Sequence, residues 1–177
     1  MQETWGLLGG EKLFGTRRTR TLGLGAAVRE FNERAVPGLG GIWFGKQALL
    51  AILGIVVAER AREAGAHVRN IEVANAIEAL ACWLAFKSNS WTQDRRLRGI
   101  NKLQAKGANF SFSQVRQRYF YVTQPMRMSS VQALPSLGFA TNEGVRFNSY
   151  RSTETGRAFV ASACDPFRPY NRDVVDH

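Results

Sequence analysis

The chain has 177 residues, 45% of them apolar, and a net charge of +10. This length and composition suffice for one well-packed domain or two small ones, and they exclude a chain that is disordered by composition. An excess of basic residues on this scale indicates a negatively charged partner, and nucleic acid is the partner that we expect.

The positive charge is concentrated in one part of the chain. Residues 1–86 carry ten Lys and Arg against eight Asp and Glu, whereas residues 87–157 carry twelve against three. Residues 158–177 carry two basic and three acidic residues. We therefore expect residues 87–157 to form the surface that meets phosphate. Arg outnumbers Lys, and its forked guanidinium suits contacts with phosphate and with guanine edges.

Two long helices are predicted in the first half. Residues 44–64 are apolar nearly all round before a charged end, which is typical of a helix at the centre of a bundle. Gly65 follows as a stop signal. Asn70 is a candidate N-cap for a second helix that runs to about Phe86. The fold class that we expect is therefore mostly α.

The longest apolar run, residues 48–58, has eleven residues, fewer than the roughly 20 that span a bilayer. We expect no membrane partner and, because polar residues and Gly follow Met1, no signal peptide. The apolar first half can instead join a protein partner or a second copy.

A polar break at residues 87–90 marks the expected domain boundary, with a helical part over residues 1–88 and a basic part over residues 89–177. A basic helix is predicted over residues 91–106. It carries Arg95, Arg96 and Arg98, together with Lys102 and Lys106. This helix either follows a phosphate backbone or is simply a solvated face.

The next segment predicts two shorter helices. Ser111 or Ser113 can cap a helix through about Tyr121, and Pro125 prevents its continuation. The pair Ser129–Ser130 can cap a second helix, residues 131–134, which Pro135 shortens. The sequence Leu-Gly-Phe at 137–139 is a typical helix end.

A hairpin and a closing helix are predicted after Gly138. Residues 139–141 and 145–147 are short strand-like runs around the turn Asn-Glu-Gly at 142–144, and the second run continues through Tyr150. A further helix is expected to begin at Thr153 and to continue through Val160.

This series of elements resembles the end of a bacterial winged helix-turn-helix domain. In that family a helix that ends in Leu-Gly and an apolar residue precedes the wing, and a helix with the pattern Thr-x-x-Gly often follows it. Residues 137–139 and 153–156 carry both patterns here. The resemblance covers about 50 residues and implies a C-terminal winged-helix-like domain. Pro135 departs from the family pattern because it shortens the presumed recognition helix.

The resemblance assigns candidate contacts by position. It places the recognition helix at residues 126–134, the wing around residues 146–151 and a preceding helix at residues 112–121. With the predicted basic helix, the candidate nucleic-acid-binding residues are Arg95, Arg96, Arg98, Arg116, Arg118, Arg127, Ser129, Ser130, Gln132, Arg146, Asn148 and Arg151. Each of them can also be an ordinary solvated residue.

The function that we expect is binding of nucleic acid, duplex DNA first, as a regulator or as the DNA-contacting subunit of a larger bacterial assembly. One alternative is a structural subunit whose winged-helix fold binds protein. A second is RNA binding, in which the aromatic residues 119–121 stack on bases.

We expect no enzyme, no cofactor and no metal site. The two cysteines, Cys82 and Cys164, form no CxxC pair, and only two histidines accompany them. The sequence shows no carboxylate cluster, no His-dependent triad and no Walker-type loop. Both cysteines are expected to be free thiols in a reducing cytoplasm.

Overall fold

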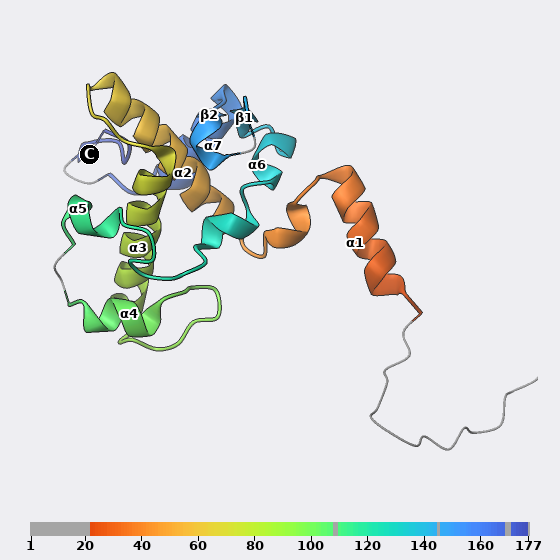
Figure 1. Ribbon diagram of the computed structural model, residues 1–177, viewed down its shortest axis with the longest axis horizontal. Coiled ribbons are helices and arrows are strands. Elements are labelled where there is room, and N and C mark those ends of the chain that lie inside the picture. Colours follow the sequence, from red (N-terminus) through yellow and green to blue (C-terminus); the bar gives the residue numbers. More distant parts are fainter. Residues whose placement is uncertain (1–21, 108–109, 145, 169–170, 177) are drawn as a thin grey trace, which may run out of the picture.

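The fold is mostly α (Figure 1). The computed structural model describes residues 22–107, 110–144, 146–168 and 171–176. The helices and strands are α1 (Leu24–Ala35), η1 (Leu39–Gly41), α2 (Gly45–Glu63), α3 (Asn70–Ser88), α4 (Ile100–Ala105), α5 (Phe112–Val115), η2 (Met126–Ser129), α6 (Ala133–Ser136), β1 (Ala140–Asn142), η3 (Phe147–Ser149), β2 (Tyr150–Ser152) and α7 (Glu154–Cys164).

The helices α2 and α3 form the centre of the molecule, and they confirm the two long helices expected from the sequence (Figure 1). They approach closely at one point, where a Cβ on Gly54 would lie 2.6 Å from the Cβ of Ala74. A side chain at residue 54 would therefore push the two helices apart. Among the described residues, no helix combines the length and the apolarity needed to cross a membrane.

Two hydrophobic clusters are built around this pair of helices. In the first, Ile52 and Ile55 of α2 pack with Leu134, Tyr150 and Val160 from the second half of the chain. In the second, α3 contributes Cys82 and Phe86, which pack with residues 103, 115, 120, 121 and 126. Residues from both sides of the expected boundary near residue 88 therefore pack in the same two clusters.

Asn70 links the two halves, although we expected it to cap α3. It is the first residue of α3, and its buried side-chain amide donates to the carbonyls of Phe147 at 3.1 Å and Tyr150 at 2.9 Å. Its side-chain oxygen accepts from Arg62 at 2.9 Å. The backbone amide of Arg69 is instead bound by Glu72. Asn70 thus fixes the start of β2 against the start of α3.

The prediction of a basic helix over residues 91–106 is wrong for residues 91–99, which are not helical. Only α4, at residues 100–105, is helical there. Ser90 and Trp91 have positive φ values of 49° and 57°. The carboxylate of Asp94 accepts the amide of Arg96 at 2.9 Å, a local turn that competes with helix formation.

The two helices predicted over residues 111–121 and 131–134 are shorter or displaced. The first ends at Val115, and Tyr119 has a φ of 66°, which a helix cannot accommodate. The second is α6, whose third residue is Pro135. Proline is tolerated in a first turn, because the amides there have no partner inside the helix. Gly138, at φ 72°, ends the segment as expected.

The hairpin is present, but its second strand lies later than predicted. Residues 140–142 pair antiparallel with residues 150–152. Residues 147–149 form the helical turn η3, and Val145 lies outside the described residues. The closing helix is confirmed as α7, where the Thr153 hydroxyl accepts the amide of Gly156 at 3.0 Å.

Candidate nucleic-acid interface

Two of the twelve candidate contact residues are interior, which corrects the prediction for both. The side chain of Arg127 is 5% exposed, and Ser130 is fully buried. The Ser130 hydroxyl donates to the carbonyl of Arg127 at 3.2 Å. Because both side chains are enclosed by the chain itself, neither can reach a nucleic acid in this conformation.

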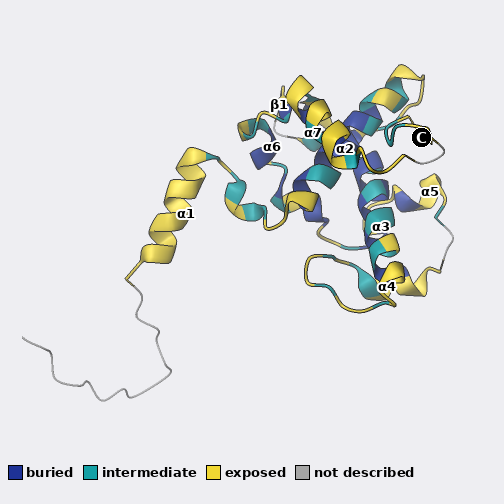
Figure 2. Cartoon of the chain, turned by 180° about the vertical axis from the view of Figure 1, so that it is seen from behind, coloured by how far each residue is buried: buried dark blue, intermediate teal, exposed yellow. Residues whose placement is uncertain are grey.

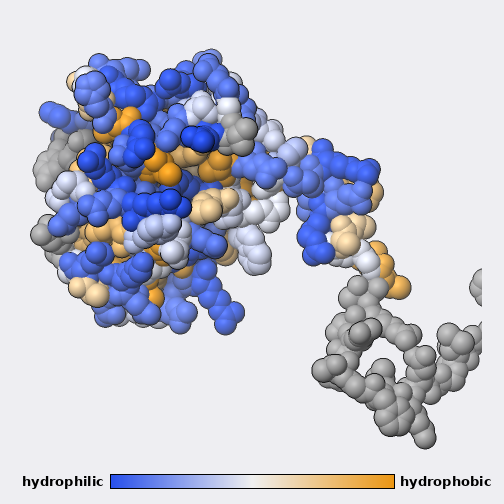
Figure 3. Space-filling model, viewed as in Figure 1, coloured by the Kyte–Doolittle hydropathy of each residue, from blue (hydrophilic) through white to orange (hydrophobic). Residues whose placement is uncertain are grey.

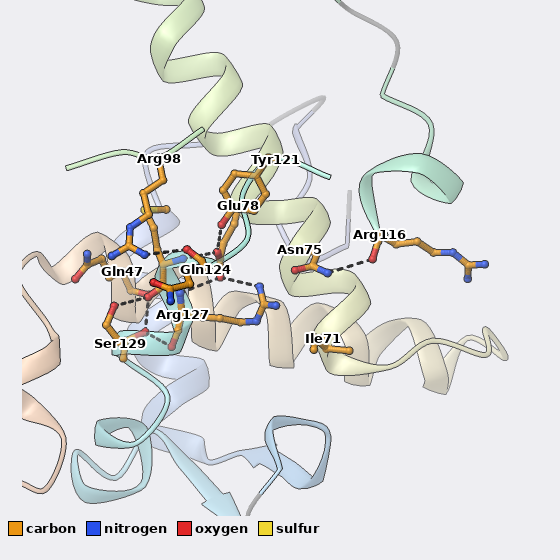
Figure 4. Close-up of polar contacts among 12 residues, drawn as sticks. Gln47, Ile71, Asn75, Glu78, Arg98, Arg116, Tyr121, Gln124, Arg127 and Ser129 are labelled. Atoms are coloured by element: carbon orange, nitrogen blue, oxygen red, sulfur yellow. Dashed lines mark hydrogen bonds and ion pairs between the residues drawn. The ribbon is translucent and has the colours of Figure 1, made fainter. Parts of the chain in front are cut away.

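Arg127 belongs to a buried polar network around Glu78 of α3 (Figure 4). The Glu78 carboxylate accepts the Arg127 guanidinium at 3.3 Å, the amide of Met126 at 3.0 Å and the hydroxyl of Tyr121. Burial, together with the Glu78 charge, raises the pKa of Tyr121 above its ordinary range, so this hydroxyl stays protonated and donates. The network thus fastens residues 121–127 to α3.

Four further candidates are near the surface but already have partners within the chain. Arg96 binds both oxygens of Asp94, which holds the pKa of that carboxyl low, at about 2. Arg98 donates to the carbonyl of Gln124 at 2.8 Å (Figure 4). The Ser129 hydroxyl donates to Met126, and the Gln132 amide donates to Glu33. These contacts orient surface loops, so each of the four side chains must give up or share a contact to bind phosphate. Arg95 lies in the same loop and is exposed.

The three candidates of the expected wing lie beside the start of α3. The side-chain oxygen of Asn148 accepts the amide of Ile71 at 3.0 Å. Arg146 and Arg151 are exposed. Arg151 is close enough to Arg62 for the two positive charges to interact, and burial and then this repulsion lower the pKa of Arg62. Within the described ranges neither Arg146 nor Arg151 forms an ion pair, so the hairpin presents two exposed positive charges at this end of α3.

Arg116 lies near the same end of α3, on a different segment. Its carbonyl accepts the side-chain amide of Asn75 at 3.2 Å, which docks the end of α5 on α3 (Figure 4). Its guanidinium is exposed and stands 3.8 Å from the carboxylate of Glu72. A single exposed ion pair of this length is weak, so Arg116 can exchange Glu72 for phosphate.

Three cations lie close to the neighbouring rings of Tyr119 and Phe120, beside α4. The Arg118 guanidinium lies over the Tyr119 ring, 4.7 Å from its centroid. The Lys102 ammonium donates to the Tyr119 carbonyl at 3.3 Å, and the Lys106 ammonium lies 4.5 Å from the centroid of Phe120. We name Lys102, Lys106, Arg118 and Tyr119 the Tyr119 cluster. In the described parts of the chain, no carboxylate forms an ion pair with its three cations.

Tyr119 itself has two unusual features. Its φ of 66° is uncommon for a large side chain, and such conformations occur often at functional sites. Its side chain is 48% exposed, whereas the neighbouring Phe120 and Tyr121 are core residues. The fold therefore turns one ring of this aromatic triplet outward while it buries the other two. Removal of two rings from the surface weakens the case for RNA binding through base stacking.

Of this cluster, Arg118 was a candidate DNA contact, and Tyr119 was named only for base stacking in the RNA alternative. Lys102 and Lys106 were placed on a basic helix that either follows phosphate or is a solvated face. The available signal was their spacing of four residues, which puts them on one side of a helix. Their approach to Tyr119 and Phe120 depends on a long-range fold that local spacing does not reveal.

The described residues also bear on other kinds of site. They contain no group of three or more His, Cys, Asp and Glu side chains placed to hold a metal ion. Burial raises the pKa of the Cys82 thiol to about 11, so this thiol is not a ready nucleophile. Comparisons of the chain with protein-family models, with curated proteins and with solved structures found no match.

Proposed function

We propose that this chain binds nucleic acid, with duplex DNA as its first target, through phosphate contacts that centre on the Tyr119 cluster. The observation that carries the proposal is that three cations contact two neighbouring aromatic residues: Arg118 and Lys102 contact the exposed Tyr119, and Lys106 lies over the ring of Phe120. No carboxylate of the described residues is paired with these cations. Three neighbouring positive charges repel one another, and a phosphate backbone relieves that repulsion.

The chemistry of each member fits this role. Lys102 and Lys106 provide compact charges on flexible stems, which suit contact with phosphate oxygens that lie along a groove. The Arg118 guanidinium lies over the Tyr119 ring, and this contact restrains the side chain at the surface and lowers the entropy lost on binding. The second face of the Tyr119 ring is a possible platform for a sugar or a base.

The winged-helix interpretation extends the proposed surface toward the hairpin. Arg146, Asn148 and Arg151 would form the wing beside the first turn of α3, with Arg116 next to them. The Tyr119 cluster lies close to Arg116, because Arg116 and Arg118 are two residues apart in the chain and their Cα atoms can be separated by no more than about 7 Å. The cluster, Arg116 and the wing would then form one continuous surface for a phosphate backbone.

Base reading by residues 126–134 is not part of the proposal. Their arginine and one of their serines are buried, and the helical turns η2 and α6 have four residues each. A recognition helix needs several exposed side chains on one face to meet base edges. Binding through phosphate alone predicts weak discrimination between DNA sequences.

Fluorescence anisotropy with a labelled duplex tests the proposal. The substitution Arg118→Glu should weaken binding at least tenfold and lower the magnitude of the salt slope by about 1 or more, because at least one phosphate contact is lost. The matched control is Arg29→Glu, which changes the net charge equally on α1, far from the cluster.

Three outcomes are informative. Loss of affinity in Arg118→Glu alone supports the proposed site. Equal loss in both variants means that only net charge matters, which overturns the site. Much tighter binding of single-stranded DNA or RNA than of duplex would keep the site but replace its target, with Tyr119 as a base-stacking platform.

A further inference from the structure

The helix α1 carries an apolar strip that the described residues of its own chain leave uncovered. Leu24, Val28 and Phe31 are 66%, 56% and 70% exposed, and their spacing puts them on one side of the helix. No residue of α1 is buried, and the helix extends away from the rest of the molecule (Figure 2). Apolar residues are visible on α1 among hydrophilic ones in the space-filling view (Figure 3).

A helix of this kind needs a covering surface to be stable. α1 has twelve residues, and isolated helices of that length are marginal in water. The exposed ion pair between Glu30 and Arg34 adds little to its stability. The strip therefore indicates a contact that the described residues of a single chain do not provide.

The connection after α1 holds the helix off its own body. Glu33 accepts the amide of Gly38 at 3.0 Å and the side-chain amide of Gln132 at 3.4 Å. Gly38, at φ 81°, packs so closely on Gln132 that an added Cβ would lie 2.7 Å from the Cβ of that side chain. These contacts fix the end of α1, so the strip cannot turn onto its own chain without breaking them.

An apolar groove that could accept this strip lies on the same chain, between the start of α2 and the end of α3. It has a volume of about 800 Å³, and its apolar lining includes Trp43, Leu49, Leu50, Ala85 and Leu97. Trp43 is 78% exposed at its edge. Lys46, Asp94 and Arg96 stand around it. A groove of this size can accept the three large side chains of a helix face.

We infer that α1 of one copy docks in this groove on a second copy, and that the exchange is reciprocal. Each chain has one strip and one groove. In a two-fold symmetric dimer, each strip would occupy the groove of the other chain, so both strips and both grooves would be covered. The connection over residues 36–41 is short and anchored, which favours exchange between chains over closure within one chain. The inference is independent of the nucleic-acid site, because the Tyr119 cluster contributes no residue to the groove.

Light scattering coupled to size-exclusion chromatography tests the exchange on the whole chain. The wild type should be a dimer, and Phe31→Asp should be a monomer, because the new carboxylate would be buried in an apolar groove. The matched control is Ala26→Asp, which adds the same charge to the opposite side of α1 and should leave the dimer intact. Neither variant alters a buried residue, so the thermal unfolding midpoints of the dissociated chains should agree.

A complementation experiment distinguishes exchange from any other dimer. Ala85→Glu should block the groove and also give a monomer. An equimolar mixture of Phe31→Asp and Ala85→Glu retains one intact strip and one intact groove, so it should recover dimer that neither variant forms alone. A wild-type monomer at every concentration, a Phe31→Asp dimer, or a mixture that stays monomeric would each overturn the inference.

Discussion

Two arginine–tyrosine pairs that are close together in the sequence differ in burial: one is enclosed in the fold, and the other lies on the surface. Arg127 and Tyr121 are buried, and both bind the carboxylate of Glu78. Arg118 and Tyr119 are exposed and stack on each other, and no carboxylate of the described chain pairs with that guanidinium. The same two residue types therefore stabilise the interior at Arg127 and Tyr121, and form a positively charged surface at Arg118 and Tyr119.

The difference follows from the cost of burying charge. A guanidinium without water needs a carboxylate and further hydrogen bonds, which Glu78 supplies to Arg127. An exposed guanidinium keeps its hydration and remains free to exchange water for phosphate. Within a basic region of sequence, only the side chains that the fold exposes to solvent can therefore contribute to nucleic-acid binding.

The largest effect is expected from removal of the buried acid. Glu78→Ala leaves the Arg127 charge enclosed without its partner, and we expect the free energy of unfolding to fall by about 3–5 kcal/mol. Urea denaturation monitored by tryptophan fluorescence measures this change. Glu143→Ala is the control, because Glu143 is exposed and its replacement should cost less than about 0.5 kcal/mol. Equal losses in the two variants would contradict the role given to Glu78.

A smaller effect is expected at Asn70, which is buried but uncharged. Asn70→Ala leaves the carbonyls of Phe147 and Tyr150 without their donor, so unfolding should become easier by about 1–3 kcal/mol. Hydrogen exchange should also quicken at residues 150–152, because β2 loses its attachment to α3. Unchanged exchange in β2 would show that the hairpin is held by other contacts.

The surface arginine should behave in the opposite way. Arg118→Gln is expected to change the free energy of unfolding by less than about 0.5 kcal/mol, since only an exposed stacking contact is lost. The same substitution should weaken binding to duplex DNA. Denaturation and anisotropy on one preparation check both parts. A clear loss of stability would assign Arg118 to the structure and not to an interface.

The two cysteines extend the comparison to chemical reactivity. Burial raises the pKa of Cys82 to about 11, and burial also raises that of Cys164, which is only partly enclosed. At pH 8 a disulfide reagent should modify Cys164 first and Cys82 only upon unfolding. Because the pKa of Cys82 is higher in the fold than its ordinary value of 9.0, its contribution to stability is present below pH 9 and lost between pH 9 and 11. Fast labelling of Cys82 in the native state would contradict its burial.

The sequence predicted the helical core well, because a long, largely apolar segment without proline that ends at a glycine is a strong signal for a buried helix. It also predicted the Gly138 stop and the start of α7, where turn and cap residues act locally. The basic helix over residues 91–106 failed because the Asp94 side chain forms a local turn that competes with helix propensity.

The candidate interface could be predicted only in part. Charge counts located the basic region of the sequence, but they could not separate Arg118 from Arg127. That separation depends on the buried Glu78, which lies 49 residues before Arg127. Long-range pairing of this kind has no periodic signature in the sequence. The left-handed backbone of Tyr119 is likewise set by contacts with α4 and the core on either side of it.

The most direct test of the central claim is the salt dependence of duplex DNA binding by the wild type, Arg118→Glu and Arg29→Glu. The account predicts a steep slope for the wild type and for Arg29→Glu, and a shallower slope with at least tenfold weaker binding for Arg118→Glu. Absence of binding by the wild type at low salt, or identical behaviour of the two variants, would contradict the claim that the Tyr119 cluster meets phosphate.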